Sequence, residues 1–423
     1  MDKLVVHGGA TLRGAINISG SKNASLPILA ATLLTADDCI IRRVPDVSDT
    51  NYMIQILSAL GADVERSSGT VRITSADLMD EAPYELVRRM RASICVMGPL
   101  LARNGRCVVS LPGGCVIGDR PVDLHLRGME ALGAKIEFEG GNITLTAKDG
   151  LRGAEIDLRG THGPTVLGTG NVMMAATLAE GITIIESAAA EPEVLDLANF
   201  LNSMGAKITG AGTRRIVIEG VKQLHGVEHT VIPDRIEAGT FMAAAALAGD
   251  GVTLRRVCRD HLKAITTAIE LSGHRVEFNK AGDSCTIHRG EITQGVEITT
   301  APYAGYPTDM QAQMTALLAT TPGISVVTDT IFPQRFMHCA ELKRMGADIK
   351  VSNGSAIIRG VVQLSAAPVM ASDLRASAAL VLAALNAKGS TAISRLYHID
   401  RGYEHIDEKL LMLGANVERV KER

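Results

Sequence analysis

Six stretches of the chain are apolar nearly all round and rich in alanine. They are SLPILAATLL (25–34), ASICVMGPLLA (92–102), NVMMAATLA (171–179), GTFMAAAALA (239–248), MQAQMTALLA (310–319) and RASAALVLAAL (375–385). A helix with this pattern is buried on every side, and its small side chains allow neighbouring helices to approach closely. Short β-branched segments follow these stretches and predict strands, among them CIIRRV (39–44), CVVSL (107–111), ITIIES (182–187) and ISVVTD (324–329).

A second pattern is a short tag that recurs at intervals of about 70 residues along the whole chain. It reads LGADVE (60–65), LGAKIE (132–137), MGAKIT (204–209), SGHRVE (272–277), MGADIK (345–350) and LGANVE (413–418). We interpret each tag as the end of an amphipathic helix, a glycine in the left-handed C-cap conformation, and the start of a strand.

Together the two patterns predict six units with the order strand, buried helix, strand, amphipathic helix, strand, strand. A chain of 423 residues suits two or three domains, and three buried helices wrapped by three small sheets would make one. We therefore predict an α/β (α+β) protein of two domains, each with three βαβαββ repeats, and a boundary near residue 232. The cleft between two such domains is the expected ligand site.

Composition narrows the functions that such a protein could have. The net charge is −3, aromatic residues make up 3% and Trp is absent, which argues against a nucleic-acid surface built on basic and stacking groups. The N-terminus lacks the apolar run of a signal peptide, and no stretch is long enough to span a bilayer. Seven scattered Cys without a CxxC pair favour a reducing cytoplasm, and we expect no metal centre and no cofactor.

One loop departs from the repeat pattern. PGGCVIGDRPVD (112–123) is longer than its counterparts and Gly-rich, and it places Cys115 near Arg120, which is typical of a mobile lid with a functional thiol. The alternative is a surface loop with an incidental Cys.

Cationic residues recur at the starts of the predicted helices, where unpaired N–H groups and the helix dipole bind anions. Taken singly, each would be a solvated surface charge. Five of them at equivalent ends of the repeats predict a pocket for phosphate and carboxylate: Lys22, Arg91, Arg120, Arg375 and Arg401.

Seven long motifs extend in order from one end of the chain to the other. They are SGSKNASLPILAATLL (19–34), MRAS (90–93), SLPGGCVIGDRPVDLHL (110–126), YPTDMQAQ (306–313), FPQRFMH (332–338), DLRAS (373–377) and YHIDRGYEHI (397–406). They resemble the motifs of the UDP-N-acetylglucosamine 1-carboxyvinyltransferases, which are enolpyruvyl transferases. The resemblance implies an inverse α/β barrel fold, with one domain formed by residues 21–232 and the other by 1–20 plus 233–423.

The resemblance also implies a reaction. The enolpyruvyl group of phosphoenolpyruvate would pass to the 3-hydroxyl of UDP-N-acetylglucosamine with release of phosphate, in the first committed step of peptidoglycan precursor synthesis. C3 of the enol ether must be protonated while the hydroxyl attacks C2, so that a tetrahedral adduct forms before phosphate leaves. We expect a cytoplasmic monomer whose partners are these two substrates, without nucleic acid, membrane, metal or cofactor.

Motif by motif, the resemblance implies roles for individual residues. Lys22 and Asn23 would contact phosphoenolpyruvate, Cys115 would protonate its methylene carbon, and Asp309 would face the attacking hydroxyl. The anionic groups of phosphoenolpyruvate would be held by Arg91, Arg120 and Arg401. The catalytic floor would include Asp373 and Arg375, and the nucleotide-sugar site would be lined by Arg120, Pro121, Val122, Asp123, Leu124, Thr165, Val166 and Ile331.

Two alternatives stay open at this point. The sister enzyme that acts on shikimate 3-phosphate shares the fold, although the PGGC loop and the KNAS motif favour the sugar nucleotide. The other alternative is a catalytically inactive nucleotide-sugar-binding homologue, against which the joint presence of the catalytic residues argues. The segment 159–176 departs from the family's usual pattern, with Thr165, Val166 and Leu167 preceded by THGP.

We expect Cys115 to be the reactive thiol, because neighbouring arginines favour the thiolate. An epoxide mimic of phosphoenolpyruvate such as fosfomycin should alkylate it, and mass mapping of the labelled peptide would locate the adduct. Cys115→Asp should resist alkylation and keep a proton donor, whereas Cys115→Ser should be nearly inactive because a Ser hydroxyl is too weak an acid. A label found on Cys39 or Cys258 instead would refute the assignment.

Overall fold

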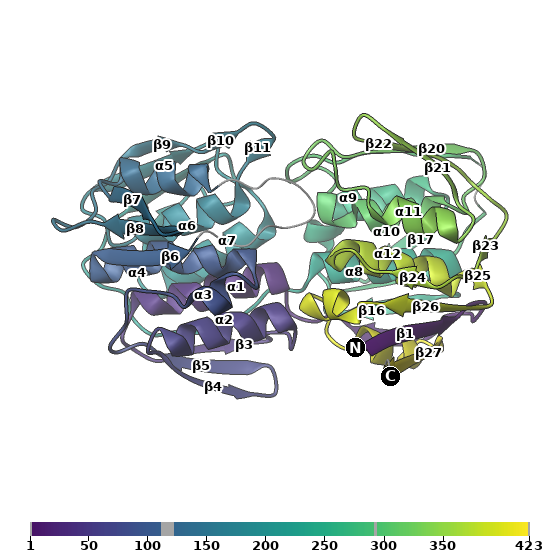
Figure 1. Cartoon of the computed structure of the whole chain (residues 1–423), viewed down its shortest axis with the longest axis horizontal. Coiled ribbons are helices and arrows are strands. Elements are labelled where there is room, and N and C mark those ends of the chain that lie inside the picture. Colours follow the sequence, from purple (N-terminus) through teal and green to yellow (C-terminus); the bar gives the residue numbers. More distant parts are fainter. Residues whose placement is uncertain (1, 111–121, 292–293, 422–423) are drawn as a thin grey trace. The chain divides into compact units, whose positions relative to one another are not determined.

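The computed structural model describes residues 2–110, 122–291 and 294–421 (Figure 1). Within these residues the chain forms two compact units, one of residues 20–232 and one of residues 2–19 with 233–421. No described helix is both long and apolar enough to cross a membrane.

The helices alternate between two kinds, as the repeats predict. In unit 20–232 the buried helices are α1 (Lys22–Ala31), α4 (Met97–Asn104) and α6 (Val166–Ala176), and the amphipathic ones are α2 (Ser48–Ala59), α5 (Asp123–Ala131) and α7 (Pro192–Ser203). In the other unit the buried helices are α8 (Arg235–Ala248), α10 (Gln311–Leu318) and α12 (Leu374–Leu385), and the amphipathic ones are α9 (Arg259–Leu271), α11 (His338–Arg344) and α13 (Ile406–Met412). Shorter helical segments are α3 (Tyr84–Val87) and the 3-10 turns η1 (Thr32–Leu34), η2 (Arg91–Val96), η3 (Thr308–Met310) and η4 (Leu396–Arg401).

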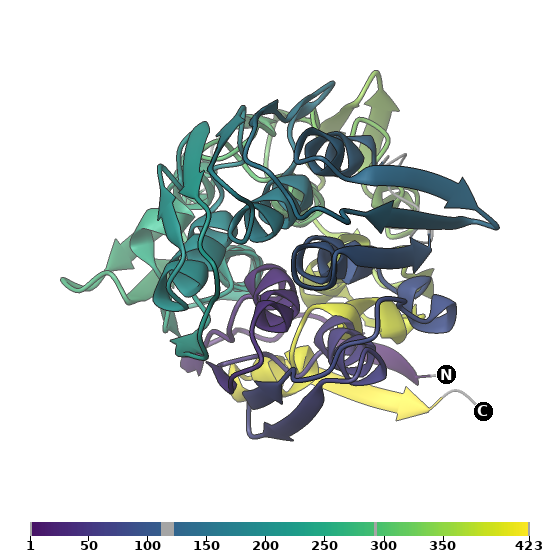
Figure 2. The ribbon, with the colours of Figure 1, turned by 90° about the vertical axis from the view of Figure 1, so that its left-hand side faces the viewer.

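Three small sheets cover the helices of each unit. In unit 20–232 their strand orders are β15 (Glu228–Thr230)–β3 (Cys39–Arg42)–β5 (Thr70–Thr74)–β4 (Asp63–Ser67), then β6 (Arg106–Ser110)–β8 (Asn142–Thr146)–β7 (Lys135–Glu139), and β13 (Lys207–Thr209)–β14 (Arg215–Glu219)–β12 (Ile182–Glu186)–β9 (Glu155–Asp157). A hairpin of β10 (Arg159–Gly160) and β11 (Gly163–Pro164) lies beside them in sequence. In Figure 2 the helices of this unit are seen nearly end-on, with strands outside them.

The second unit repeats the arrangement. Its sheets are β17 (Arg275–Phe278)–β18 (Ser284–His288)–β16 (Val252–Arg255)–β2 (Ala15–Asn17), then β19 (Glu297–Thr299)–β20 (Ile324–Thr328)–β22 (Ser355–Arg359)–β21 (Asp348–Ser352), and β24 (Val369–Met370)–β26 (Ser390–Ser394)–β1 (Asp2–His7)–β27 (Asn416–Lys421). A further parallel pair joins β23 (Leu364–Ser365) to β25 (Ala387–Lys388).

Three strands lie in sheets formed mainly by distant parts of the chain. β2 precedes α1 in sequence but pairs with β16, with Ile16 opposite Leu254, and β15 precedes α8 but pairs with β3. The first strands of repeats one and four are therefore exchanged between the units. β1 supplies the last strand of repeat six by pairing with β27, so residues 2–19 belong with 233–421.

The tag glycines have the predicted backbone conformation in all six repeats. Their φ angles are positive: 99° at Gly61, 97° at Gly133, 101° at Gly205, 88° at Gly273, 92° at Gly346 and 87° at Gly414. In the first repeat the N–H of Ala62 donates to the carbonyl of Leu57 and that of Gly61 to Ser58, the paired bonds of a Schellman motif. The tag therefore ends each amphipathic helix by satisfying its last carbonyls.

The buried helices differ in two respects from the apolar stretches that predicted them. Four begin earlier, because a side chain before the helix accepts a hydrogen bond from its first turn: Ser21 before α1, Thr165 before α6, Asp234 before α8 and Asp373 before α12. The stretch 92–102, predicted as one helix, is divided into η2 and α4. A single α-helix there would need an N–H at residue 99, which is Pro99, and Pro99 instead occupies the first turn of α4.

Close approach between buried helices depends on small residues. Gly98 of α4 donates its N–H to Asn171 Oδ1 of α6 at 2.7 Å, and a Cβ at position 98 would lie 2.3 Å from the Asn171 carbonyl oxygen.

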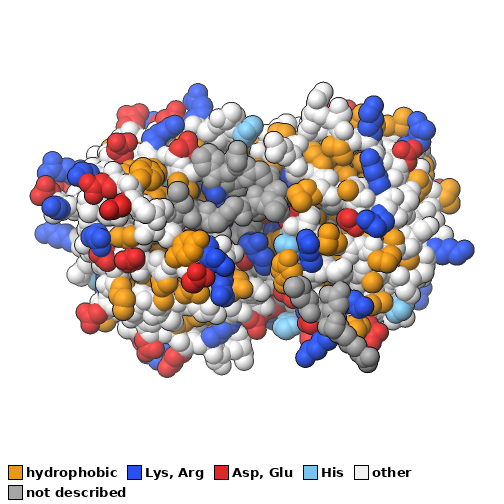
Figure 3. All heavy atoms as spheres, in the orientation of Figure 1, with side chains coloured by type: hydrophobic (Ala, Val, Ile, Leu, Met, Phe, Trp, Pro, Cys, Tyr) orange, Lys and Arg blue, Asp and Glu red, His pale blue; other side chains and the backbone are white. Residues whose placement is uncertain are grey.

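Outside this core the surface is ordinary for a globular protein. On the face shown in Figure 3, Lys and Arg side chains are interspersed with Asp and Glu over each unit.

Gly98→Ala should destabilise unit 20–232 by roughly 1–3 kcal/mol or more, because the new methyl group meets main-chain atoms that cannot move away. Gly170→Ala in α6 is the matched control, since its Cβ would meet only the terminal Cδ2 of Leu197 at 3.1 Å. Better helix propensity offsets that contact, and we expect a change within about 1 kcal/mol. Urea unfolding followed by circular dichroism would measure both, and equal stabilities would contradict the close packing.

Candidate active site

The predicted site residues fall into two groups, one in each unit. In unit 20–232, Lys22 and Asn23 are the first two residues of α1, after the Ser21 cap. Lys22 Nζ lies 3.4 Å from Asp49 Oδ2 at the start of α2, and the Asp49 side chain is only 3% exposed. Asp49 therefore supplies the charge that a nearly buried lysine requires.

Arg91 begins η2, which packs against α1, and it lies near His125 of α5. His125 is buried, and burial together with the charge of Arg91 lowers the pKa of its imidazole to about 3. Hydrogen bonds of Asn171 determine the tautomer of His125. Its Oδ1 accepts from Gly98, so its Nδ2 donates to the Ile94 carbonyl at 2.8 Å and faces His125 Nδ1 at 3.0 Å. Nδ1 must then be the acceptor, and the neutral ring carries its proton on Nε2.

Residues predicted to line a nucleotide-sugar site lie on neighbouring segments of the same unit. Val122 occupies the position before α5, Asp123 is exposed at its first turn, and Leu124 follows. A Cβ at Gly160 would lie 3.0 Å from Leu124 Cδ1, so α5 and the β10–β11 hairpin are in contact there. The hydroxyl of Thr165 is the cap of α6, which ties its position to the helix, and Val166 is 38% exposed at the first position.

In the other unit, Asp309 of η3 is held by two arginines. Arg335 Nη1 donates to Asp309 Oδ1 at 2.8 Å, and Arg375 Nη2 donates to Asp309 Oδ2 at 2.9 Å. The Arg335 and Arg375 side chains are 7% and 3% exposed, against 26% for Asp309. Burial by itself would lower the pKa of the Arg375 guanidinium, but the charge of Asp309 raises it above its usual value. One carboxylate is thus oriented by two fixed cations.

Asp373 and Arg401 lie close enough to the same residue, His398, for the charges of both to affect its pKa. Asp373 caps α12 by accepting from the N–H groups of Arg375 and Ala376. Burial lowers the pKa of His398, which also lies near Arg401 and Asp373. Next to Arg401, Asp400 accepts two hydrogen bonds from Arg419, at 2.9 and 3.0 Å, and this clamp fixes the end of η4.

Ile331 is positioned through its main chain. Asp329, which is 1% exposed, accepts from the N–H groups of Ile331 and Phe332 and from the hydroxyls of Thr300 and Thr308. The segment that carries Ile331 is therefore connected to Thr308, the neighbour of Asp309.

Some predicted site residues cannot be placed, and some residues near the site were not predicted. Cys115, Arg120 and Pro121 lie outside the described residues. Sequence patterns missed Asp49, His125 and Arg335, although the motifs 110–126 and 332–338 contain the last two. In the part of the chain that the structure describes, no group of three His, Cys, Asp or Glu side chains could hold a metal ion.

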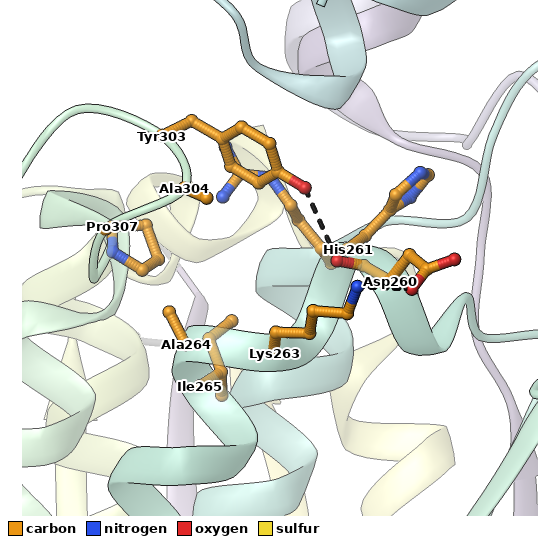
Figure 4. Close-up of a pocket in the computed structure, with 10 residues that line it drawn as sticks. Asp260, His261, Lys263, Ala264, Ile265, Tyr303, Ala304 and Pro307 are labelled. Carbon is orange, nitrogen blue, oxygen red and sulfur yellow. Dashed lines mark hydrogen bonds and ion pairs between the residues drawn. The ribbon is translucent and has the colours of Figure 1, made fainter.

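A separate cavity of about 140 Å³ lies in the unit of residues 2–19 and 233–421, between the start of α9 and the segment 303–307 (Figure 4). The Tyr303 hydroxyl donates to the Asp260 carbonyl at 3.3 Å, and Asp260 pairs with Lys263 at 2.7 Å. None of the predicted site residues lines it. Because ligand pockets usually exceed roughly 300 Å³, we assign no ligand to this cavity.

Comparison with known proteins shows the family to which the chain belongs. The family described as EPSP synthase (3-phosphoshikimate 1-carboxyvinyltransferase) matches residues 6–410. The chain belongs to this family of enolpyruvyl transferases. A UDP-N-acetylglucosamine 1-carboxyvinyltransferase from Akkermansia muciniphila is 72% identical over 420 residues, which cover 99% of each chain. Another protein of that name, from Methylacidiphilum infernorum, is 56% identical over 421 residues and 99% of each chain.

Solved structures of enolpyruvyl transferases have the same fold. The enolpyruvyl transferase NikO from Streptomyces tendae aligns with a TM-score of 0.90 at 25% identity, covering 100% of this chain and 99% of that chain. An EPSP synthase from Acinetobacter baumannii aligns with a TM-score of 0.75 at 18% identity over 100% of both chains. The predicted fold class, an inverse α/β barrel of βαβαββ repeats, is therefore confirmed.

Acid should destabilise this enolpyruvyl transferase partly through His125. The pKa of its folded form lies below the usual 6.5, so its contribution is complete above pH 6.5 and is lost as the pH falls towards 3. At pH 5 the loss is about 2 kcal/mol. His125→Gln keeps an acceptor for Asn171 and should reduce the difference in unfolding free energy between pH 7 and pH 5 by about that amount.

The exposed His162 in the same unit provides the control. His162→Gln should leave the pH dependence of urea unfolding unchanged. If the two variants behaved alike, the burial of a neutral His125 would be refuted.

Proposed function

We propose that this chain transfers the enolpyruvyl group of phosphoenolpyruvate to the 3-hydroxyl of UDP-N-acetylglucosamine, releasing phosphate, in the first committed step of peptidoglycan precursor synthesis. The observation that carries the proposal is the 72% identity, over 420 residues, to a protein named for this activity. EPSP synthases share the fold, but two solved EPSP synthases from Acinetobacter baumannii are only 18% and 19% identical to this chain.

The site residues have distinct roles in this proposal. Cys115 delivers a proton to C3 of phosphoenolpyruvate, while the carboxylate of Asp309 accepts the proton of the attacking hydroxyl. The new C–O bond forms at C2, and the tetrahedral adduct then loses a C3 proton and phosphate. The paired oxygens of Asp309 support its role, because Arg335 and Arg375 fix the direction in which the carboxylate points.

Fixed cations hold the anionic groups of phosphoenolpyruvate in the same proposal. They are Lys22, Arg91, Arg120 and Arg401, with Asn23 beside the reacting centre. Lys22 supports this role because it starts α1, where main-chain N–H groups also favour an anion. The uridine and diphosphate would contact Pro121 to Leu124, Thr165, Val166 and Ile331, and Asp373 would complete the catalytic floor.

The proposal also covers the setting of the reaction. The six described cysteines are all free thiols, as expected of a reducing cytoplasm. We take the enzyme to act there as a monomer, with its two substrates as partners, and its mass in solution would test the monomer.

Release of phosphate from phosphoenolpyruvate should require UDP-N-acetylglucosamine and should not occur with shikimate 3-phosphate. A coupled phosphate assay with each acceptor measures this, and mass spectrometry of the product should show an added enolpyruvyl group. Phosphate release only with shikimate 3-phosphate would show that the chain has the sister activity instead. Release with neither acceptor would overturn both activities.

The same assay tests the anion site. Lys22→Ala should weaken binding of phosphoenolpyruvate by about 10- to 150-fold, because a hydrogen bond to a charged group contributes roughly 1.5–3 kcal/mol. Lys148→Ala, at an exposed lysine of the same unit, should leave binding unchanged. If Lys22→Ala bound phosphoenolpyruvate as tightly as Lys148→Ala, Lys22 would have no place in the site.

A further inference from the structure

A closed ring of buried polar groups lies directly behind Asp309. Gln313, on the first turn of α10, donates from Nε2 to the main-chain carbonyl of Asp309 at 2.9 Å. The same amide group lies 3.1 Å from the Tyr403 hydroxyl and 3.1 Å from the Thr240 hydroxyl of α8. Gln313 is 0% exposed, and Thr240 and Tyr403 are each 2% exposed.

The ring closes on the Asp309 side chain through Arg375. The guanidinium carbon of Arg375 is 5.5 Å from the centroid of the Tyr403 ring, within the range of a cation–π contact. Arg375 in turn donates to Asp309 Oδ2. Asp309 is thus held twice from the same cluster, at its main chain by Gln313 and at its carboxylate by Arg375 above Tyr403.

The protons in the ring can be assigned. The Thr240 hydroxyl donates to the Ile236 carbonyl at 2.8 Å, so at the 2.8 Å contact with Tyr403 the phenol must be the donor. Burial raises the pKa of the Tyr403 phenol, against the charge of Arg375, and keeps this proton in place. One Gln313 N–H then serves the Asp309 carbonyl, and the other is shared between the Tyr403 and Thr240 oxygens. Every hydrogen bond among Asp309, Gln313, Tyr403 and Thr240 then has a defined donor and acceptor.

A comparison of two buried glutamines on α10 distinguishes a role in helix packing from a role at the candidate active site. Gln311 and Gln313 are both 0% exposed, and in each the amide oxygen has no hydrogen-bond partner among the described residues. In the described part of the chain, Gln311 Nε2 bonds only to Thr315 of its own helix, at 3.4 Å. A buried amide left partly unpaired lowers stability. Both glutamines carry that cost, and only Gln313 is bonded to Asp309.

We propose that Gln313 and Tyr403 are positioning residues of the reaction, which hold Asp309 in the direction of the attacking hydroxyl by fixing its main chain and, through Arg375, its carboxylate. This inference rests on the proposed function. It adds a layer of residues that do not touch the substrate but determine the geometry of the group that does. A displacement of about 1 Å at such a group can cost about 100-fold in rate.

The test compares Gln313→Met with Gln311→Met, two replacements of similar shape on one helix. Gln313→Met should lower kcat for phosphate release by roughly 10- to 100-fold and leave the KM for phosphoenolpyruvate within about twofold, because the proposed function assigns the binding of phosphoenolpyruvate to residues other than Gln313 and Asp309. Gln311→Met should change neither constant by more than about twofold. Melting temperatures of both variants are measured as well, and kcat is compared at a temperature where each is fully folded, so that lost stability cannot explain the difference.

Tyr403 provides a second, independent arm. Tyr403→Phe keeps the aromatic ring beneath Arg375 and should retain most of the kcat. Tyr403→Leu removes the ring, and its kcat should fall to that of Gln313→Met. Equal kcat values for Gln313→Met and Gln311→Met, in an active wild-type enzyme, would overturn the positioning role and leave the proposed function intact. An inactive wild-type enzyme would overturn the proposed function itself. Crystal structures are a further test: if Asp309 lay in the same place in both glutamine variants, the positioning role would be refuted.

Discussion

Burial of six helices over most of their length is the constraint on which the rest of the molecule depends. A helix in contact with neighbours on every side can carry large polar groups only at its ends, so its length is filled with Ala, Gly and small polar residues. All residues of α12 from Arg375 to Leu385 are buried. The charged groups of the candidate site are thereby placed at helix ends, and Lys22 and Arg375 both lie in first turns.

A second constraint follows from placing charges at buried helix ends. A cation that loses water must gain a partner. Lys22 has Asp49, while Arg335 and Arg375 share Asp309. These pairs explain how a chain with a net charge of −3 can concentrate cations locally. They also orient the acids, and in the proposed reaction the orientation of Asp309 is the property that matters.

Much of the candidate site was predictable where a residue stands at a fixed place in a repeat or motif. Lys22 and Arg375 were expected at helix starts and are found there. The partners were not predictable, because they are remote in sequence: Arg335 and Arg375 lie 26 and 66 residues from Asp309. Gln313 is part of a motif, but nothing in its letters distinguishes it from Gln311. Only its contact with Asp309 does so.

The sequence by itself determined the six repeats, their internal order, the burial of the Ala-rich helices and the left-handed glycines that end the amphipathic ones. These features depend on interactions within about five residues, where periodicity and steric limits act directly. The family resemblance implied that residues 1–20 join the second domain, but only the tertiary structure decided which strands β1, β2 and β15 pair with and which acid meets which cation. The hydrogen-bonding edge of a strand is the same whatever its sequence, so the choice of partner is made by packing of the whole unit.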